Sequence, residues 1–316
     1  MASGAASLVN TRATVEAALR GRRGEVRGRV FQGTLLLTLL VSLGVLLTLI
    51  WTTWNQASPV FAERGWSFVT SNLSSLASRA GVRQGVVGSL ILVAFVAVVA
   101  MPLGVAAAVY LQEYARDTRL NRLLITNVRN LAGVPSIVYG ILGFAVFSQA
   151  LRSVTGPSVA GRSYLSGALT LSVLVMPIII LVTMEALSAV PKSIREAAYG
   201  VGATRWEVVR SHVLPYAAPG IFTGGILSLA RAFGETAPLL MVGAVTGYLS
   251  PSRGGSVIEV LQGPFTALPT EIFSFSRQIG DDWRANAAAA IIVLLAVILL
   301  VNALAIVLRN RYERKW

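Results

Sequence analysis

Long runs of apolar residues, separated by short polar segments, dominate the pattern of this 316-residue chain. A helix that crosses the hydrocarbon core of a bilayer needs about 20 consecutive, mostly apolar residues. Six segments meet this requirement, at residues 32–54, 86–111, 124–150, 166–187, 218–245 and 287–308. The pattern therefore predicts an all-α membrane protein with six transmembrane helices.

The distribution of Lys and Arg predicts how these spans are oriented, because cytoplasmic loops carry an excess of both. Eighteen of them fall in the two tails and in the loops after the second and fourth spans, against eight in the other loops. We therefore expect both termini in the cytoplasm, a basic tail over residues 1–30 and a transmembrane domain over residues 31–316. The outer segment 246–286 either docks an extracytoplasmic partner or packs on the mouth of the bundle.

Composition agrees with a membrane protein and excludes several functions. Hydrophobic residues make up 54% of the chain and charged residues only 13%, whereas soluble domains have about 25% charged residues. The absence of cysteine and the single histidine exclude thiolate catalysis and multi-histidine metal sites. The net charge of +13 is spread between the apolar runs, so we expect no nucleic-acid binding. We also expect no metal site and no catalytic residue in this chain.

The loop between the fourth and fifth spans carries the strongest local signal. Ala197 and Ala198, which follow Glu196, are small enough for another element to approach closely. Gly202 permits a sharp turn between two short helices, and Arg195 belongs to their charged face. Such a helix pair on the cytoplasmic side suits docking into a cleft of another protein. The alternative is an amphipathic helix that lies on the membrane surface.

A second signal lies inside the fifth span, where Arg231 and Glu235 are four residues apart. A charge at the bilayer centre costs about 2.5–3.5 kcal/mol on insertion scales, and such residues usually serve function. On one helical face the two side chains can pair. With the neighbouring Thr236, they predict a polar seam along a substrate path, where the guanidinium could bind an oxyanion. The alternative is an ion pair that only holds the bundle together.

The spacing of the cytoplasmic motif resembles the EAA signature of permeases of ATP-binding-cassette (ABC) importers. The matching positions are Glu196, Ala197, Ala198, Gly202, Leu214 and Pro215. This resemblance implies the fold of a type I importer permease, in which a coupling region over residues 191–215 contacts a separate ATPase. The expected coupling residues are Arg195, Glu196, Ala197, Ala198 and Gly202.

Residues 231–238, together with 133–140 and 302–312, are similar to the phosphate-specific branch of these permeases. The resemblance implies a permease subunit of an ATP-driven phosphate importer in the bacterial cell membrane, forming half of the translocation path. The expected partners are a homologous permease, two copies of an ATPase, an extracytoplasmic phosphate-binding protein, phosphate and membrane lipid.

No G-x-x-x-x-G-K-[ST] loop occurs in the chain, so ATP binding and hydrolysis belong to the partner ATPase and this subunit is not an enzyme. Two alternatives remain open. One keeps the fold and changes the cargo to molybdate, tungstate or sulfate. The other is a secondary transporter independent of ATP, for which inverted repeats would be expected.

Overall fold

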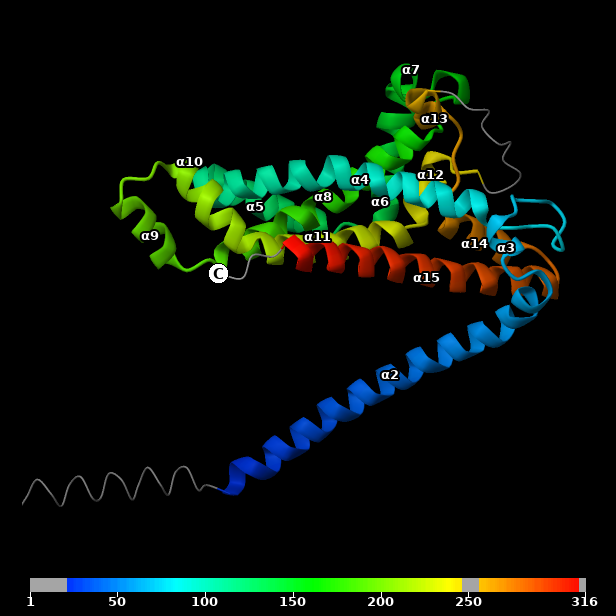
Figure 1. The fold of residues 1–316 in the computed structure, drawn as a ribbon, viewed down its shortest axis with the longest axis horizontal. Coiled ribbons are helices and arrows are strands. Elements are labelled where there is room, and N and C mark those ends of the chain that lie inside the picture. Colours follow the sequence, from blue (N-terminus) through cyan, green and yellow to red (C-terminus); the bar gives the residue numbers. More distant parts are fainter. Residues whose placement is uncertain (1–21, 246–255, 313–316) are drawn as a thin grey trace, which may run out of the picture. The chain divides into compact units, whose positions relative to one another are not determined.

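The computed structural model describes residues 22–245 and 256–312, and the chain divides into two compact units, Met1–Asn55 and Gln56–Trp316. The first unit contains most of helix α2 (Arg22–Arg64), and the second contains the other helices (Figure 1). These are α3 (Ser67–Thr70), α4 (Arg83–Val109), η1 (Tyr110–Tyr114), α5 (Arg119–Ala132), α6 (Ser136–Gly143), η2 (Phe144–Ala150), α7 (Arg152–Thr155), η3 (Pro157–Val159), α8 (Tyr164–Ser188), α9 (Lys192–Gly200), α10 (Arg205–Val208), η4 (Val209–Val213), α11 (Leu214–Gly234), α12 (Ala237–Val242), α13 (Val257–Gln262), α14 (Leu268–Arg277) and α15 (Asp281–Tyr312).

Among the described residues, five helices are long and apolar enough to cross a bilayer. They cover Gly28–Arg64, Arg83–Tyr114, Tyr164–Ser188, Arg205–Gly234 and Asp281–Arg311. Four of them contain the first, second, fourth and sixth predicted spans whole, so the expectation of an all-α, multi-pass membrane protein is confirmed. Residues 1–21 of the predicted basic tail lie outside the described residues, whereas its residues 22–30 already belong to α2.

The third predicted span, 124–150, is not one straight helix. It consists of α5 and the continuous α6–η2 helix, which meet at an angle of 100°. Pro135 explains the break, because proline lacks a backbone N–H and disfavours helical geometry in the residue before it. The Tyr139 hydroxyl donates a hydrogen bond across the break to the carbonyl of Leu131, at 2.9 Å.

The fifth predicted span, 218–245, also differs from the structure. Helix α11 begins at Leu214 and ends at Gly234, and Glu235 is extended, with ψ of 118°. The chain then continues in α12, with Pro238 at one of its first positions. Pro238 cannot donate a backbone hydrogen bond to the preceding turn, which favours a break of the helix in this segment.

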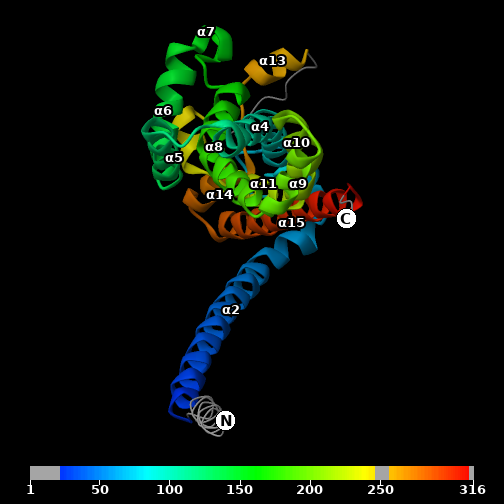
Figure 2. The ribbon, with the colours of Figure 1, turned by 90° about the vertical axis from the view of Figure 1, so that its left-hand side faces the viewer.

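Helix α8 forms the centre of the second unit, with α4, α5, α6 and α11 around it (Figures 1 and 2). Over its most apolar stretch, 61% of the residues are buried within the chain. Glycines allow the close contacts: a Cβ added to Gly104 would approach Ile179 Cγ2 to 2.6 Å, and one on Gly143 would approach Thr170 Oγ1 to 2.1 Å. Small residues at such contacts are typical of helix packing in membranes.

A second apolar cluster closes the end of the bundle that carries α3 and α14, opposite α9 and α10 (Figure 1). Phe68 is fully buried in it. The Arg64 guanidinium organises the connection between α3 and α4, since it donates to the carbonyls of Ala77 (3.2 Å) and Ala80 (2.8 Å). It also contacts the side chain of Asn286 on α15. This end of the bundle is therefore an ordered cap.

Candidate functional site

The two short helices expected in the loop after the fourth span are present as α9 and α10. Helix α9 begins after Pro191, and its chain reverses at Gly202, whose φ of +85° lies in the left-handed region that favours glycine. Helix α10 starts with a capping box, in which the Thr204 side chain accepts from Glu207 N–H and the Glu207 carboxylate accepts from Thr204 N–H. The local sequence thus fixes both helix boundaries.

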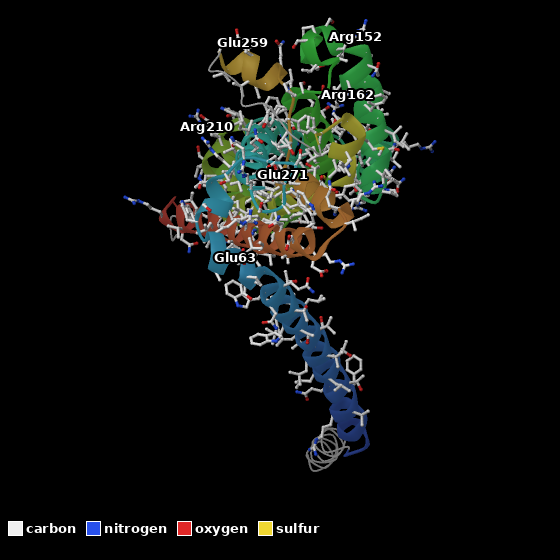
Figure 3. All side chains as sticks on the ribbon, turned by 90° about the vertical axis from the view of Figure 1, so that its right-hand side faces the viewer. Glu63, Arg152, Arg162, Arg210, Glu259 and Glu271 are labelled. Atoms are coloured by element: carbon white, nitrogen blue, oxygen red, sulfur yellow. The ribbon has the colours of Figure 1, made fainter. Side chains whose placement is uncertain are left out.

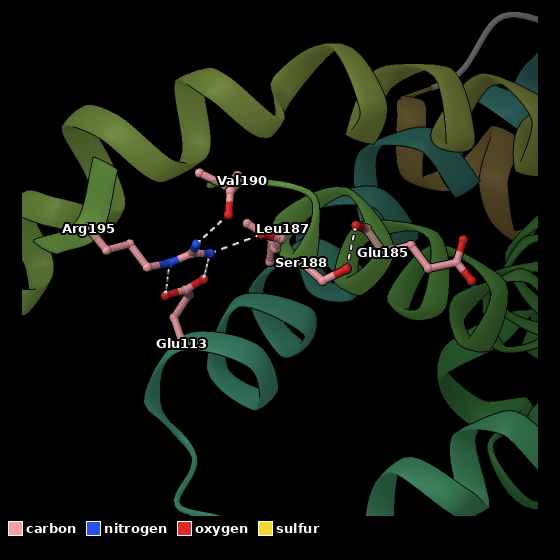
Figure 4. Close-up of polar contacts among 6 residues, drawn as sticks. All are labelled: Glu113, Glu185, Leu187, Ser188, Val190 and Arg195. Carbon is pink, nitrogen blue, oxygen red and sulfur yellow. Dashed lines mark hydrogen bonds and ion pairs between the residues drawn. The ribbon is translucent and has the colours of Figure 1, made fainter. Parts of the chain in front are cut away.

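Arg195 ties α9 to the ends of two spans (Figure 4). Its Nη2 donates to Glu113 Oε1 at 2.7 Å and its Nε to Glu113 Oε2 at 3.4 Å. The same guanidinium donates to the carbonyls of Leu187 (2.9 Å) and Val190 (2.8 Å). The Arg195 and Glu113 side chains are only 19% and 10% exposed. Arg195, expected on a charged face that contacts a partner, is therefore engaged within its own chain.

A π-helical turn positions Glu113, whose carboxylate pairs with Arg195. At the end of α4, η1 places the N–H of Ala115 within 2.8 Å of the Tyr110 carbonyl, a spacing of five residues. Such turns rotate the side chains that follow and frequently occur at functional sites. Tyr114 of the same turn lies under the guanidinium of Arg205, 5.1 Å from ring centroid to Cζ. The contact between Glu113 and Arg195 could not be predicted from the sequence, because the two residues lie far apart along the chain.

The outward side of α9 and its turn exposes apolar side chains. Ala198 is buried in a cluster with Leu187 and Val213, whereas Glu196 and Ala197 are exposed. The largest exposed apolar residues here are Tyr199 (47% exposed), Val201 (87%) and Trp206 (57%). Beside them lies a groove of about 560 Å³ whose lining includes Glu196, Tyr199 and Arg205. This surface combines exposed apolar side chains with neighbouring charged groups, a composition that suits a protein-binding site.

Arg231 and Glu235 form the ion pair expected from their spacing, with 3.3 Å between Nε and Oε1. They do not share one continuous helix, however, because α11 ends at Gly234 between them. Arg231 is 52% exposed and Glu235 14%, and Thr236 is half-buried at the start of α12. The pair thus presents an open guanidinium beside a more enclosed carboxylate, at the junction of two helices.

The two groups of predicted residues lie at opposite ends of α11. The coupling residues precede its start at Leu214, and the Arg231–Glu235 pair closes its last turn. A 21-residue helix is about 30 Å long at 1.5 Å per residue. They are therefore two separate sites that one helix connects.

Glu271 on α14 was not predicted as a site residue, and it is the most unusual carboxylate in the described chain. It is fully buried, and its two oxygens lie against Gly85 of α4 without a hydrogen-bond partner among the described residues. Figure 3 shows it within the bundle. Burial raises the pKa of the Glu271 carboxyl well above its usual range. The sequence shows it only as one acid in the outer segment 246–286.

The chain is similar to several transport permeases. It is 30% identical over 308 residues to the phosphate transport system permease protein PstC of Mesorhizobium japonicum, with 90% of each chain covered. It is 34% identical over 238 residues to the phosphate transport system permease protein PstA 1 of Mycobacterium tuberculosis, with 72% of this chain and 71% of that protein covered. The similarity to the probable ABC transporter permease protein YqgI of Bacillus subtilis is 33% over 185 residues and spans 58% of this chain and 60% of that protein.

The fold is also found in solved structures of ABC transporters. A bacterial transporter involved in the import of the acidic polysaccharide alginate aligns with a TM-score of 0.56 at 16% identity, over 87% of this chain and 96% of that chain. The MetNI methionine transporter in an inward-facing conformation aligns with a TM-score of 0.52 at 19% identity, over 79% and 97%. Residues 100–315 match one family throughout, and the chain therefore belongs to the binding-protein-dependent transport system inner membrane components.

Proposed function

We propose that this chain is a membrane permease subunit of an ATP-driven importer of inorganic phosphate. Its similarity to permeases named PstC and PstA supports phosphate as the cargo. The motifs at residues 231–238 and 302–312 favour the PstA type of subunit. In this proposal, the chain forms half of a translocation path and a homologous permease of the PstC type forms the other half.

The observation that carries the proposal is the half-exposed guanidinium of Arg231 at the α11–α12 junction. A phosphate that leaves water must exchange its hydration for fixed donors, and a guanidinium offers a planar fork of donors that matches two phosphate oxygens. Glu235 keeps the guanidinium paired between transport events. Because the carboxylate competes for the same donors, it weakens phosphate binding and so favours release.

The cytoplasmic surface supplies the energy coupling in this proposal. The exposed residues Tyr199, Val201 and Trp206, with Glu196 and Ala197 beside them, dock against an ATPase of the PstB type, which binds ATP and is present in two copies. Both termini then lie in the cytoplasm of a bacterium, and the opposite end of the bundle receives phosphate from a binding protein of the PstS type. Arg195 acts by holding α9 in place.

Uptake of labelled phosphate by the reconstituted complex, with molybdate, tungstate and sulfate as competitors, tests the cargo. We expect unlabelled phosphate to reduce the uptake of labelled phosphate, and molybdate, tungstate and sulfate at the same concentration to leave it unchanged. Uptake that persists with an ATPase-inactive partner would overturn ATP-driven import, and preferential uptake of another anion would overturn phosphate as the cargo.

Substitutions of the charged pair test the path. We expect Arg231→Ala to reduce phosphate uptake by about 30- to 150-fold, since loss of a charge-assisted, two-bond contact is worth roughly 2–3 kcal/mol. Glu235→Gln should slow release and lower the maximal rate while phosphate binds more tightly. Arg152→Ala is the matched control, because Arg152 is an exposed arginine of α7 that belongs neither to the pair nor to the coupling region. An Arg231→Ala complex that assembles and transports at the wild-type rate would refute the role.

A further inference from the structure

A cavity of about 720 Å³ lies at the end of α12 that is remote from the Arg231–Glu235 junction. Its apolar walls include Leu240 and Met241 of α12 and Phe273 of α14. Two arginines, Arg162 and Arg277, are the charged groups among the described residues that line it. The cavity therefore combines apolar walls with two positive charges, and no carboxylate occurs among the described residues that line it.

The chain holds Arg162 at this cavity by close packing. Gly243 ends α12 with φ of +104°, and a Cβ placed on it would come within 2.7 Å of Arg162 Cγ and Cδ. The aliphatic part of Arg162 therefore lies directly on the backbone of Gly243. The chain after α12 is fixed in turn, because Val245 N–H donates to the Phe265 carbonyl at 2.7 Å and Thr266 Oγ1 donates to the Val245 carbonyl at 2.9 Å.

Arg277 comes from the last turn of α14, on the other side of the cavity. Its Cζ lies 5.5 Å from the ring centroid of Phe273, a distance at which the ring face attracts a cation. Both Arg162 and Arg277 are exposed, and neither forms an ion pair with a residue in the described part of the chain. The acidic residue of the same helix, Glu271, lies instead against Gly85 of α4.

The cavity and the charged pair lie at the two ends of one short helix. Glu235 and Thr236 precede α12, whereas Gly243 follows it. Six helical residues span about 9 Å. The two ends of α12 are therefore about 1.7 helical turns apart, which is the displacement that an anion moving along α12 from the cavity to the Glu235 end would need.

We propose that Arg162 and Arg277 form an anion-binding vestibule that holds phosphate before it reaches Arg231. This inference rests on the proposed function, since it assumes that phosphate is the cargo. Two guanidinium groups without a competing carboxylate collect the anion from the outer side. The cavity is large enough for phosphate to keep part of its hydration, so binding is weak and transfer to Arg231 is not blocked.

Protection from an arginine-selective reagent tests binding directly on the wild-type complex. Phenylglyoxal modification of each arginine is followed by peptide mass spectrometry, with and without inorganic phosphate at constant ionic strength. We expect phosphate to slow modification of Arg162 and Arg277 by about fivefold or more, because bound phosphate occupies the guanidinium donors. Arg152, an exposed arginine of α7 that does not line the cavity, serves as the control (Figure 3). Equal protection of all three arginines, or of none, would overturn the vestibule.

Transport by charge-neutral variants tests its role. The double variant Arg162→Gln and Arg277→Gln should lower phosphate uptake at least about tenfold at limiting phosphate, as expected when charged donors are lost. Arg152→Gln should transport normally, and retained binding-protein-stimulated ATP hydrolysis shows that the double variant is assembled. Double-variant uptake equal to the wild type refutes the vestibule alone. Absence of phosphate uptake by the wild-type complex refutes the proposed function, whatever the variants do.

Discussion

Replacement of Arg195 by alanine should release α9 from the two spans that hold it. The substitution removes both bonds to the Glu113 carboxylate, at 2.7 and 3.4 Å. It also removes the donors to the carbonyls of Leu187 and Val190, at 2.9 and 2.8 Å. One side chain thus provides four contacts between α9, the end of α4 and the end of α8.

The burial of the pair sets the magnitude. Arg195 is 19% and Glu113 10% exposed, so truncation of the arginine leaves a carboxylate that is largely removed from water and unpaired, at a cost of about 3–5 kcal/mol. Glu113→Gln preserves the size of the side chain and one acceptor, and should cost about 1.5–3 kcal/mol. Because the two residues share one contact, their effects should not add.

Hydrogen exchange of the α9 amides in the assembled permease measures this effect. We expect exchange in Arg195→Ala to accelerate about 100-fold or more, the factor that corresponds to about 3 kcal/mol of lost local stability. ATP hydrolysis stimulated by the binding protein should fall in parallel. Arg152→Ala, at an exposed arginine of α7 outside the coupling region, should change neither quantity. Exchange within threefold of wild type in Arg195→Ala, or additive effects of Arg195→Ala and Glu113→Gln, would refute the reasoning.

Three further substitutions test other parts of the fold. Gly202→Ala should destabilise the α9–α10 turn by about 1–2 kcal/mol, because the left-handed φ of +85° strains any Cβ; a melting temperature within error of wild type would contradict this. Glu271→Gln should remove a pH dependence of stability. Burial raises the pKa of Glu271 in the folded state, so the protonated carboxyl contributes stability to the fold that is complete below the unfolded pKa. This contribution is lost as pH rises through the folded pKa. In thermal melts, the variant should therefore be more stable than the wild type at alkaline pH but not at acid pH. Gly143→Ala should cost about 1–3 kcal/mol by overpacking against Thr170, and Thr170→Ala in the same chain should restore part of the loss in denaturant titrations.

The parts of the fold set by the bilayer could be predicted from sequence, and the breaks could not. Runs of apolar residues reveal spans directly, because a bilayer of fixed thickness demands a minimum length. The bend before Pro135 and the end of α11 at Gly234 lie inside such runs. Hydropathy does not report the backbone geometry within a run of apolar residues. Pro135 and Pro238 were visible signals for both, but proline is also tolerated within transmembrane helices.

The candidate sites were predictable where the partners are close in sequence. The spacing of Arg231 and Glu235 indicates their pairing, because four residues make one helical turn. The contact between Arg195 and Glu113 joins residues 82 positions apart, and depends on how α4 and α8 pack. Burial of Glu271 likewise depends on the approach of α14 to Gly85. Tertiary packing, rather than any local pattern, determines both.

The break between α11 and α12 makes the distance between Arg231 and Glu235 depend on the angle between the two helices. Arg231 belongs to the last turn of α11, and Glu235 lies beyond its end. A continuous helix would hold two such residues at constant separation, because backbone hydrogen bonds fix the pitch. Here the two residues are joined through a junction in which Pro238 contributes no backbone donor, so a change in the angle between the two helices changes the Arg231–Glu235 distance of 3.3 Å. Any movement that opens one side of the permease by bending at this junction thereby changes how far the Glu235 carboxylate neutralises the Arg231 guanidinium.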